Sequence, residues 1–134
     1  MSVLVTDAGF ASCPETATVT LADIAQHKGA LTLAHTDAPE TALPYLDALS
    51  LICIGFPAFN DGRGFTIAHR LRALGYKGRL RAVGPVIADQ YAMARRVGFD
   101  EVEIPDALAQ RQPQDQWLAR ADWQENNYLA RLRA

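Results

Sequence analysis

The loop over residues 56–65 holds the side chains whose types and spacing come closest to a ligand site. Gly62 and Gly64 would let backbone amides turn toward a ligand, and Arg63 offers a planar fork of donors for a carboxylate or a tetrahedral oxyanion. A helix that begins directly after the loop would add the positive end of its dipole. The loop therefore indicates an anion site, and the alternative is that Asn60 or Asp61 caps the helix while Arg63 pairs with a neighbouring carboxylate.

Two arginines and two polar residues further along the chain extend this candidate site. Arg79 and Arg81 fall on the same side of one predicted strand, which is unusual for a buried strand unless that side has a partner. Arg81 is nearer the carboxyl end and is the better candidate; alternatively, its stem packs and its head reaches solvent or an acid. Asp89 and Gln90 open the next predicted helix, where Asp89 favours the dipole and Gln90 could face the loop. The predicted ligand-binding residues are Asp61, Gly62, Arg63, Gly64, Arg81, Asp89 and Gln90.

Other chemistries find no support in the residue types. Cys13 and Cys53 form no CxxC pair, so we expect free thiols, and Cys53 in an apolar strand is typical of a small buried hydrophobe. The three histidines are scattered and have no spacing that would organise a metal. No nucleophile elbow, dinucleotide fingerprint, or flavin, iron–sulfur or haem pattern is present. The sequence thus predicts no metal and no cofactor, and it assigns no catalytic residue.

Four short apolar runs must supply the strands that position these side chains. They cover residues 30–34, 49–56, 79–83 and 100–104, and amphipathic stretches long enough for helices separate them. Such crossovers imply parallel pairing. The pattern predicts an α/β fold, a single domain of parallel βα units, arranged either as an open three-layer sheet or as half of a βα barrel. The run 49–56 is expected to be the central strand, covered by helices on both faces or lining a barrel core.

Helix signals lie between these runs. Residues 64–74 place apolar side chains on one face and stop at Gly75. Pro85 suits the first turn of the next helix, and Gly98 suits the C-cap of the stretch that ends at 95–97.

The single domain, residues 1–134, divides into three parts. Residues 1–28 are irregular, with possible edge strands at 3–5 and 17–21 before a helical turn, and 29–104 form the βα core. Residues 105–134 hold a polar connection and a C-terminal helix that docks on the domain or on a partner and could support an oligomer.

Length and composition exclude several classes of protein. A chain of 134 residues with 49% hydrophobic and 21% charged residues fits one globular domain. Its longest apolar run, 51–59, is too short to cross a bilayer. The N-terminus lacks the features of a secretory signal, so we expect a cytoplasmic protein. Nucleic-acid binding is disfavoured by the pI of about 5.9 and by the lack of aromatic residues within the basic run.

Charge is distributed unevenly along the chain. The net charge of −2 divides into −6 over residues 1–61, +7 over 62–99 and −3 over 100–134. The basic segment could meet an anionic ligand or an acidic partner. The alternative is internal compensation, in which these bases lie beside the acidic parts of the same domain.

An ordered motif follows the loop 56–65. It comprises Ala68, Leu71-Arg72, Gly75-Tyr76, Gly78, Leu80-Arg81-Ala82-Val83-Gly84, Asp89-Gln90, Arg96 and Gly98-Phe99-Asp100. Over about 45 residues the chain resembles the bacterial domain-of-unknown-function family 934. Members of that family commonly sit beside genes of assimilatory sulfite or nitrite reductase and are labelled oxidoreductases of sulfite reduction. The resemblance implies a role in sulfate assimilation, and any oxidoreductase activity rests on the resemblance alone.

The chain departs from the family pattern at two positions. Arg79 stands where the family usually has an acid, and Pro85 stands where it has an aspartate. If that aspartate served a shared activity, this chain would lack it.

Two hypotheses follow. In the first, the chain is an accessory protein that binds the sirohaem sulfite reductase or its electron donor through the basic segment and the C-terminal helix. In the second, it is a small enzyme or ligand-binding domain with a sulfite, sulfate or phosphate site at the loop 56–64, helped by Arg81 and Gln90. Neither involves nucleic acid or a membrane.

Overall fold

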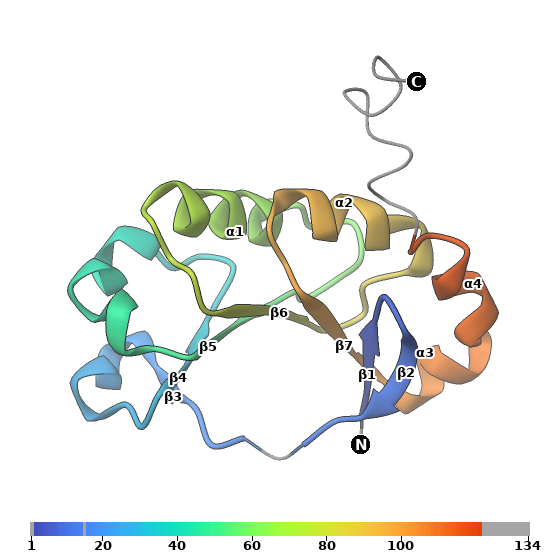
Figure 1. Cartoon of the computed structure of the whole chain (residues 1–134), viewed down its shortest axis with the longest axis horizontal. Helices are drawn as coiled ribbons and strands as arrows, with labels where there is room; N and C mark the ends of the chain where they lie inside the picture. Colours follow the sequence, from blue (N-terminus) through green and yellow to red (C-terminus); the bar gives the residue numbers. More distant parts are fainter. Residues whose placement is uncertain (1, 15, 122–134) are drawn as a thin grey trace.

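A mixed β-sheet forms the framework of the computed structural model, which describes residues 2–14 and 16–121 (Figure 1). Its strands are β1 (Ser2–Thr6), β2 (Gly9–Ser12), β3 (Val19–Thr20), β4 (Ala30–Leu33), β5 (Leu51–Gly55), β6 (Arg79–Val83) and β7 (Glu101–Pro105). Within the described residues they form a seven-stranded sheet in the order β2-β1-β7-β6-β5-β4-β3. Strands β3 to β7 run parallel, whereas β1 is antiparallel to both β2 and β7. The α/β fold is confirmed.

The five parallel strands follow one another in chain order. Right-handed crossovers between sequential neighbours all fall on one face of a sheet, whereas a three-layer arrangement needs a reversal of strand order. Helices α1 (Arg63–Ala73) and α2 (Tyr91–Val97) accordingly lie in contact with each other over the same face (Figure 1). Of the two predicted arrangements, the described residues adopt half of a βα barrel.

Alternate strand residues point toward the helices, because successive side chains of a strand face opposite sides. On α1 they meet Ile67, Ala68 and Leu71, which the helical spacing placed on one face with Leu74, and also Phe65. Leu74 is only partly buried against this core. Removal of this apolar surface from water is the main stabilising contribution to the fold. The strand residues of this core are Val5, Leu31, Leu33, Ile52, Ile54, Leu80, Ala82, Val102 and Ile104.

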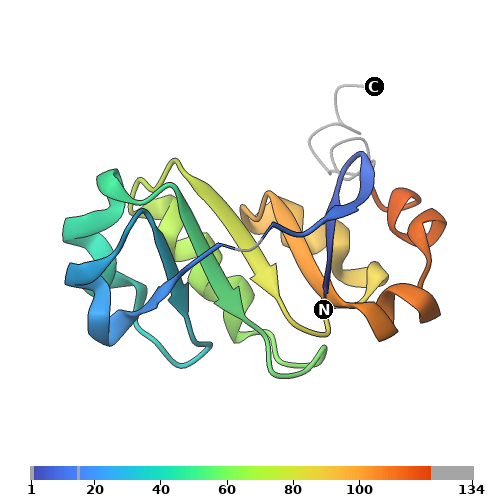
Figure 2. The same cartoon turned by 90° about the horizontal axis from the view of Figure 1, so that it is seen from below.

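The opposite face of the sheet carries a smaller apolar cluster of Ala30, Leu51 and Cys53, with Val83 packed against it. No helix among the described residues covers this cluster. The chain instead passes beneath the sheet between β2 and β3 (Figures 1 and 2). Strand β5 thus lines the inner face of the half barrel, which is one of the two settings predicted for its apolar sequence.

Two expectations for the strands are wrong. Strand β6, rather than β5, lies in the middle of the seven, and β1 is an interior strand rather than an edge strand. Both differences have one cause, because the N-terminal hairpin of β1 and β2 adds to the sheet beside β7. Strand β3 does lie at an edge, within the region 17–21 predicted for it.

The helices also differ in detail from the expectation. Pro85 precedes the helical turn η3 (Ala88–Gln90) instead of starting a helix, whereas Gly98 takes the predicted left-handed C-cap of α2, with φ of 120°. The crossovers after β3 and β4 are the 3₁₀ segments η1 (Leu21–Gln26) and η2 (Pro39–Ala48).

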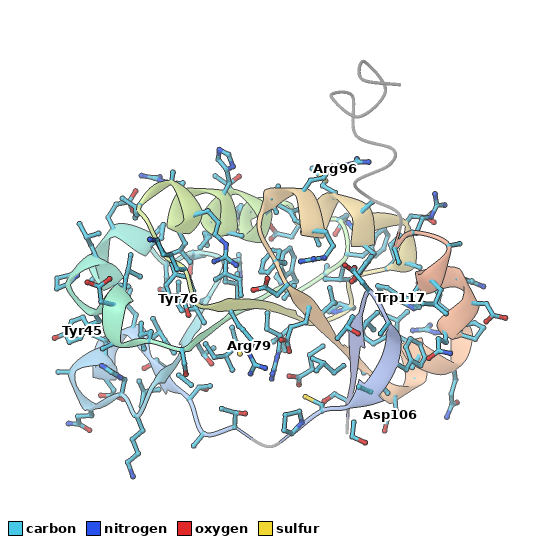
Figure 3. All side chains as sticks on the ribbon, viewed as in Figure 1. Tyr45, Tyr76, Arg79, Arg96, Asp106 and Trp117 are labelled. Carbon is cyan, nitrogen blue, oxygen red and sulfur yellow. The ribbon has the colours of Figure 1, made fainter. Side chains whose placement is uncertain are left out.

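The segment after β7 is more helical than the predicted polar connection. It forms α3 (Asp106–Arg111) and α4 (Gln114–Leu118), which carries the buried Trp117 (Figure 3). Trp117 packs edge-on against Tyr91, with ring centroids 6.1 Å apart. The C-terminal helix is predicted over residues 117–132; α4 includes Trp117 and Leu118, and the part beyond residue 121 lies outside the described residues. In the part of the chain that is described, no helix is long and apolar enough to span a membrane.

Candidate functional site

The guanidinium of Arg63, where the loop after β5 meets α1, is already engaged in an ion pair. Arg63 donates from Nε and Nη2 to the two Asp61 carboxylate oxygens, at 3.1 and 2.6 Å, and its backbone N–H donates to Oδ1 at 3.1 Å. These hydrogen bonds lower the pKa of Asp61 to about 2. His35 Nε2 lies 4.0 Å from the same carboxylate. Arg63 therefore pairs with a neighbouring carboxylate, as in the alternative interpretation of this loop.

The two glycines of the loop have ordinary backbone conformations. Gly62 is the N-cap of α1 with φ of −90°, and Gly64 is not among the glycines with positive φ. A Cβ on Gly64 would collide with the Phe56 ring, whereas one on Gly62 would meet nothing within 4 Å. Gly64 thus allows α1 to pack closely on the end of β5.

Gln90 and Asp89 point to different partners. The Gln90 amide donates to the Phe59 carbonyl and accepts the Ile87 N–H at 3.1 Å, so it ties η3 to the loop as the sequence suggested. The Asp89 carboxylate is 71% exposed and accepts a hydrogen bond from Arg120 at 3.0 Å. Only Gln90 of the two contacts the predicted site.

Arg81 lies apart from this loop, at the centre of the inner face of the sheet. Its side chain is only 2% exposed, and its Nε donates to Glu101 at 2.9 Å. Its Nη1 lies 3.4 Å from Glu103 Oε1 and 3.9 Å from Cys13 Sγ. Its Nη2 is buried and has no hydrogen-bond partner among the described residues.

The carboxylates around Arg81 keep it charged. Burial, the largest single effect, lowers the pKa of the guanidinium, but the charge and hydrogen bond of Glu101 and the neighbouring groups together raise it above its ordinary value. The same Glu101 carboxylate lies 3.6 Å from Arg79 Nε, on the face turned away from α1 (Figure 3). A buried donor without a partner costs about 1–3 kcal/mol, so Nη2 is a place where an acceptor would stabilise the protein.

Arg81 lines a cavity of about 660 Å³ between the inner face of the sheet and the segment that links β2 to β3. A second cavity of about 570 Å³ adjoins it, because both are lined by Thr32, Gly55 and Val83. The second cavity opens among residues that follow β4 and β5, where ligands of parallel sheets bind. Its lining includes His35, which follows the end of β4.

The cysteines line the first cavity but are not poised as nucleophiles. Burial raises the pKa of Cys53 to about 11 and also raises that of Cys13. Both remain thiols near neutral pH, and the thiolate is the reactive form. Among the residues that the structure describes, no group of three or more His, Cys, Asp or Glu side chains could hold a metal ion.

Glu101, Glu103 and Cys13 were not expected at this site. Arginines alternate with apolar residues over 79–81, and glutamates do the same over 101–103. One strand with a positive charge at every second residue, followed in sequence by a strand with a negative charge at every second residue, could have indicated that the two strands pair and that these side chains meet. The register places Arg81 opposite Glu101 and Val83 opposite Glu103.

Comparisons with known proteins point to a family but to no established activity. Residues 30–131 match the family described as "Bacterial protein of unknown function (DUF934)". No curated protein and no solved structure matches the chain.

Proposed function

The chain belongs to the bacterial DUF934 family, and we propose that it is an accessory protein of sulfite reduction that binds an oxyanion through Arg81. The observation that carries the binding is the buried Nη2 of Arg81, which has no partner among the described residues and belongs to a residue that lines a cavity. The setting in sulfite reduction rests on the resemblance of the motif 56–100 to proteins encoded beside sulfite reductases.

The geometry favours Arg81 as the anchor of the ligand. Glu101 and Glu103 hold two of its nitrogens, which fixes the plane of the guanidinium before a ligand arrives. An ordered donor loses less entropy on binding than a mobile one. Arg63, in contrast, is 59% exposed, and its fork already donates to both Asp61 carboxylate oxygens. Nη2 is covered by protein atoms, so donation to a ligand requires a small movement of the guanidinium or of the cavity wall.

Hydroxyl groups add further donors to this cavity. Ser2, Thr16, Thr18 and Thr32 line it together with Arg81. The Ser2 hydroxyl already donates to Glu103 and the Thr32 hydroxyl donates to Thr18, so Thr16 and Thr18 are the hydroxyls that can donate to a ligand. A hydroxyl can donate to an oxyanion and rotates to suit the position of the acceptor. The lining therefore supports a ligand whose oxygens accept several hydrogen bonds.

Charge compensation also favours ligand binding over docking through the basic segment. Arg70 pairs with Glu40, Arg72 pairs with Asp100, and Arg95 lies 3.2 Å from Asp7. These acids come from outside residues 62–99, so much of the positive excess of that segment is neutralised within the domain.

Thermal unfolding with added anions tests the binding. Sulfite, sulfate, nitrite or acetate that binds the native state raises its stability by about 2.7 kcal/mol at one hundred times Kd. We expect a higher Tm for the wild type and for Arg63→Ala, but not for Arg81→Lys, which keeps the charge near Glu101 and Glu103 and removes the fork. Chloride at equal ionic strength controls for screening.

Two results would contradict the proposal in different ways. If no oxyanion raises the Tm of the wild type, the protein has no such site. If Arg63→Ala abolishes the shift and Arg81→Lys keeps it, the site lies at the loop 56–64.

The accessory role needs a separate experiment. Tagged protein is recovered from its host grown without reduced sulfur, at low and at high salt, and the reductase and its electron donor are quantified. Enrichment of either protein over an untagged control supports the accessory role. An equal yield from the tagged and the untagged sample would refute this role without affecting the proposed anion site.

A further inference from the structure

Given the proposed binding of an anion at Arg81, we infer that its ligand is an organic acid with one negative charge and an apolar body that extends along the inner face into the second cavity. Three observations support this ligand class: the charge balance around Arg81, the continuity of the two cavities, and the residue at which they meet.

The charges around Arg81 already cancel before a ligand binds. Arg79 and Arg81 carry two positive charges, and Glu101 and Glu103 carry two negative ones within 2.9 to 3.6 Å of them. A dianion at Nη2 would bring two negative charges close to both carboxylates, in a site where little water screens them. A single charge, spread over a carboxylate or a sulfonate, meets the empty donor with less repulsion.

The walls beyond Arg81 become apolar. The second cavity is lined by Leu21, Ala22, Leu33, Phe56 and Pro57. A ligand anchored by an acidic head at Arg81 would reach these side chains by passing the residues that both cavities share. Each methylene buried there contributes about 0.8 kcal/mol, which is about a fourfold gain in affinity.

Gly55 occupies the junction of the two cavities. A Cβ at this position would lie 3.8 Å from the Leu33 carbonyl, an ordinary contact, and Gly55 is not among the glycines with positive φ. Its lack of a side chain therefore leaves space where an apolar body would pass. A valine at this position suits a strand and fills that space without backbone strain.

Calorimetric titration with straight-chain monocarboxylates from acetate to octanoate tests this inference. For the wild type, we expect affinity to rise about fourfold per methylene. Gly55→Val should flatten this dependence, and Gly55→Ala should give a dependence between those of the wild type and Gly55→Val. Arg81→Lys should weaken every acid at least tenfold. Octan-1-ol has the same chain without the charge and should bind at least tenfold more weakly than octanoate.

Each other outcome has a distinct meaning. If acetate and octanoate bind equally to the wild type, the ligand has no apolar body at this site, and the proposed oxyanion binding stands. If octanol binds as well as octanoate, or Gly55→Val keeps the full chain-length dependence, the inferred path is wrong. If sulfate binds more tightly than every monoanion, the inferred charge is wrong. If no acid or inorganic oxyanion binds, the proposed oxyanion binding at Arg81 fails as well.

Discussion

Two arginines of the same chain show how environment decides what a guanidinium can do. Arg63 lies at the surface and is held by Asp61, two residues before it. Arg81 is buried and meets Glu101 and Glu103 from the neighbouring strand. Because water competes at the surface, the Arg63 pair is screened by salt, whereas a buried guanidinium needs its partners to remain charged.

Asp61 should titrate well below its ordinary range. In the wild type its pKa should lie near 2, and Arg63→Ala should return it toward 3.8, because the hydrogen bonds from Arg63 are the main cause of the shift. The lowered pKa means that the pair contributes to stability above about pH 4 and that this contribution is lost as the pH falls through 2. NMR titration of the Asp61 carboxyl carbon measures both values. Equal midpoints in the two proteins would show that Arg63 has no such effect.

At the scale of elements, the ends of β5 and β6 are joined by a close backbone contact. Phe56 donates its N–H to Val83 O at 2.8 Å, and Gly84 donates its N–H to Glu103 O at 3.0 Å. Gly84 has φ of 135°, and a Cβ there would collide with the Phe56 carbonyl. The residue after β6 must therefore be glycine, because a side chain there would not fit against the Phe56 backbone at the end of the neighbouring strand β5.

Gly84→Ala should destabilise the fold by about 2 kcal/mol, because it adds both backbone strain and a steric collision. Urea unfolding followed by circular dichroism measures the free energy. Gly55→Ala is the matched control, since its Cβ meets only an ordinary contact at 3.8 Å, and it should change stability by less than about 0.5 kcal/mol. Similar losses in the two variants would contradict the steric argument.

At the scale of the whole molecule, the half barrel has two unlike faces. Helices α1 and α2 seal the outer face with the main apolar core, whereas the inner face combines a small apolar cluster with the ion pairs of Arg79 and Arg81. The chain between β2 and β3 lies on this inner side (Figure 2). Its Thr18 hydroxyl accepts a hydrogen bond from the Thr32 hydroxyl at 2.6 Å. The first cavity therefore lies on the face that α1 and α2 leave uncovered, and the second lies beyond the ends of β4 and β5 beside η1.

Hydrogen exchange should distinguish these regions. The backbone amides of β5, β6 and β7 should exchange most slowly, because these strands have neighbours on both sides and a buried face. Residues 16–18 are exposed, and β3 is a two-residue edge strand, so their amides should exchange at least a hundredfold faster. Exchange followed by NMR provides the comparison. Equal protection of 16–18 and β6 would show that the wall of the first cavity is as stable as the sheet.

The sequence by itself determined the local elements of this protein. Apolar periodicity placed the parallel strands and α1, and Gly98 marked the end of α2, because each of these signals depends on residues within a few positions. The same reasoning identified Arg81 as an unusual residue, since a period of two assigns it to one side of a strand. It also found the contact of Gln90 with the loop.

Only the tertiary structure decided what surrounds Arg81. Its partner Glu101 is 20 residues away, Cys13 is 68 residues away, and the Ser2 hydroxyl that meets Glu103 at 3.0 Å is 101 residues from it. Local periodicity gives the direction of a side chain but not the strand that lies next to it. The insertion of β1 beside β7 and the path of the chain to β3 enclose the inner face, and both depend on pairing between distant parts of the chain.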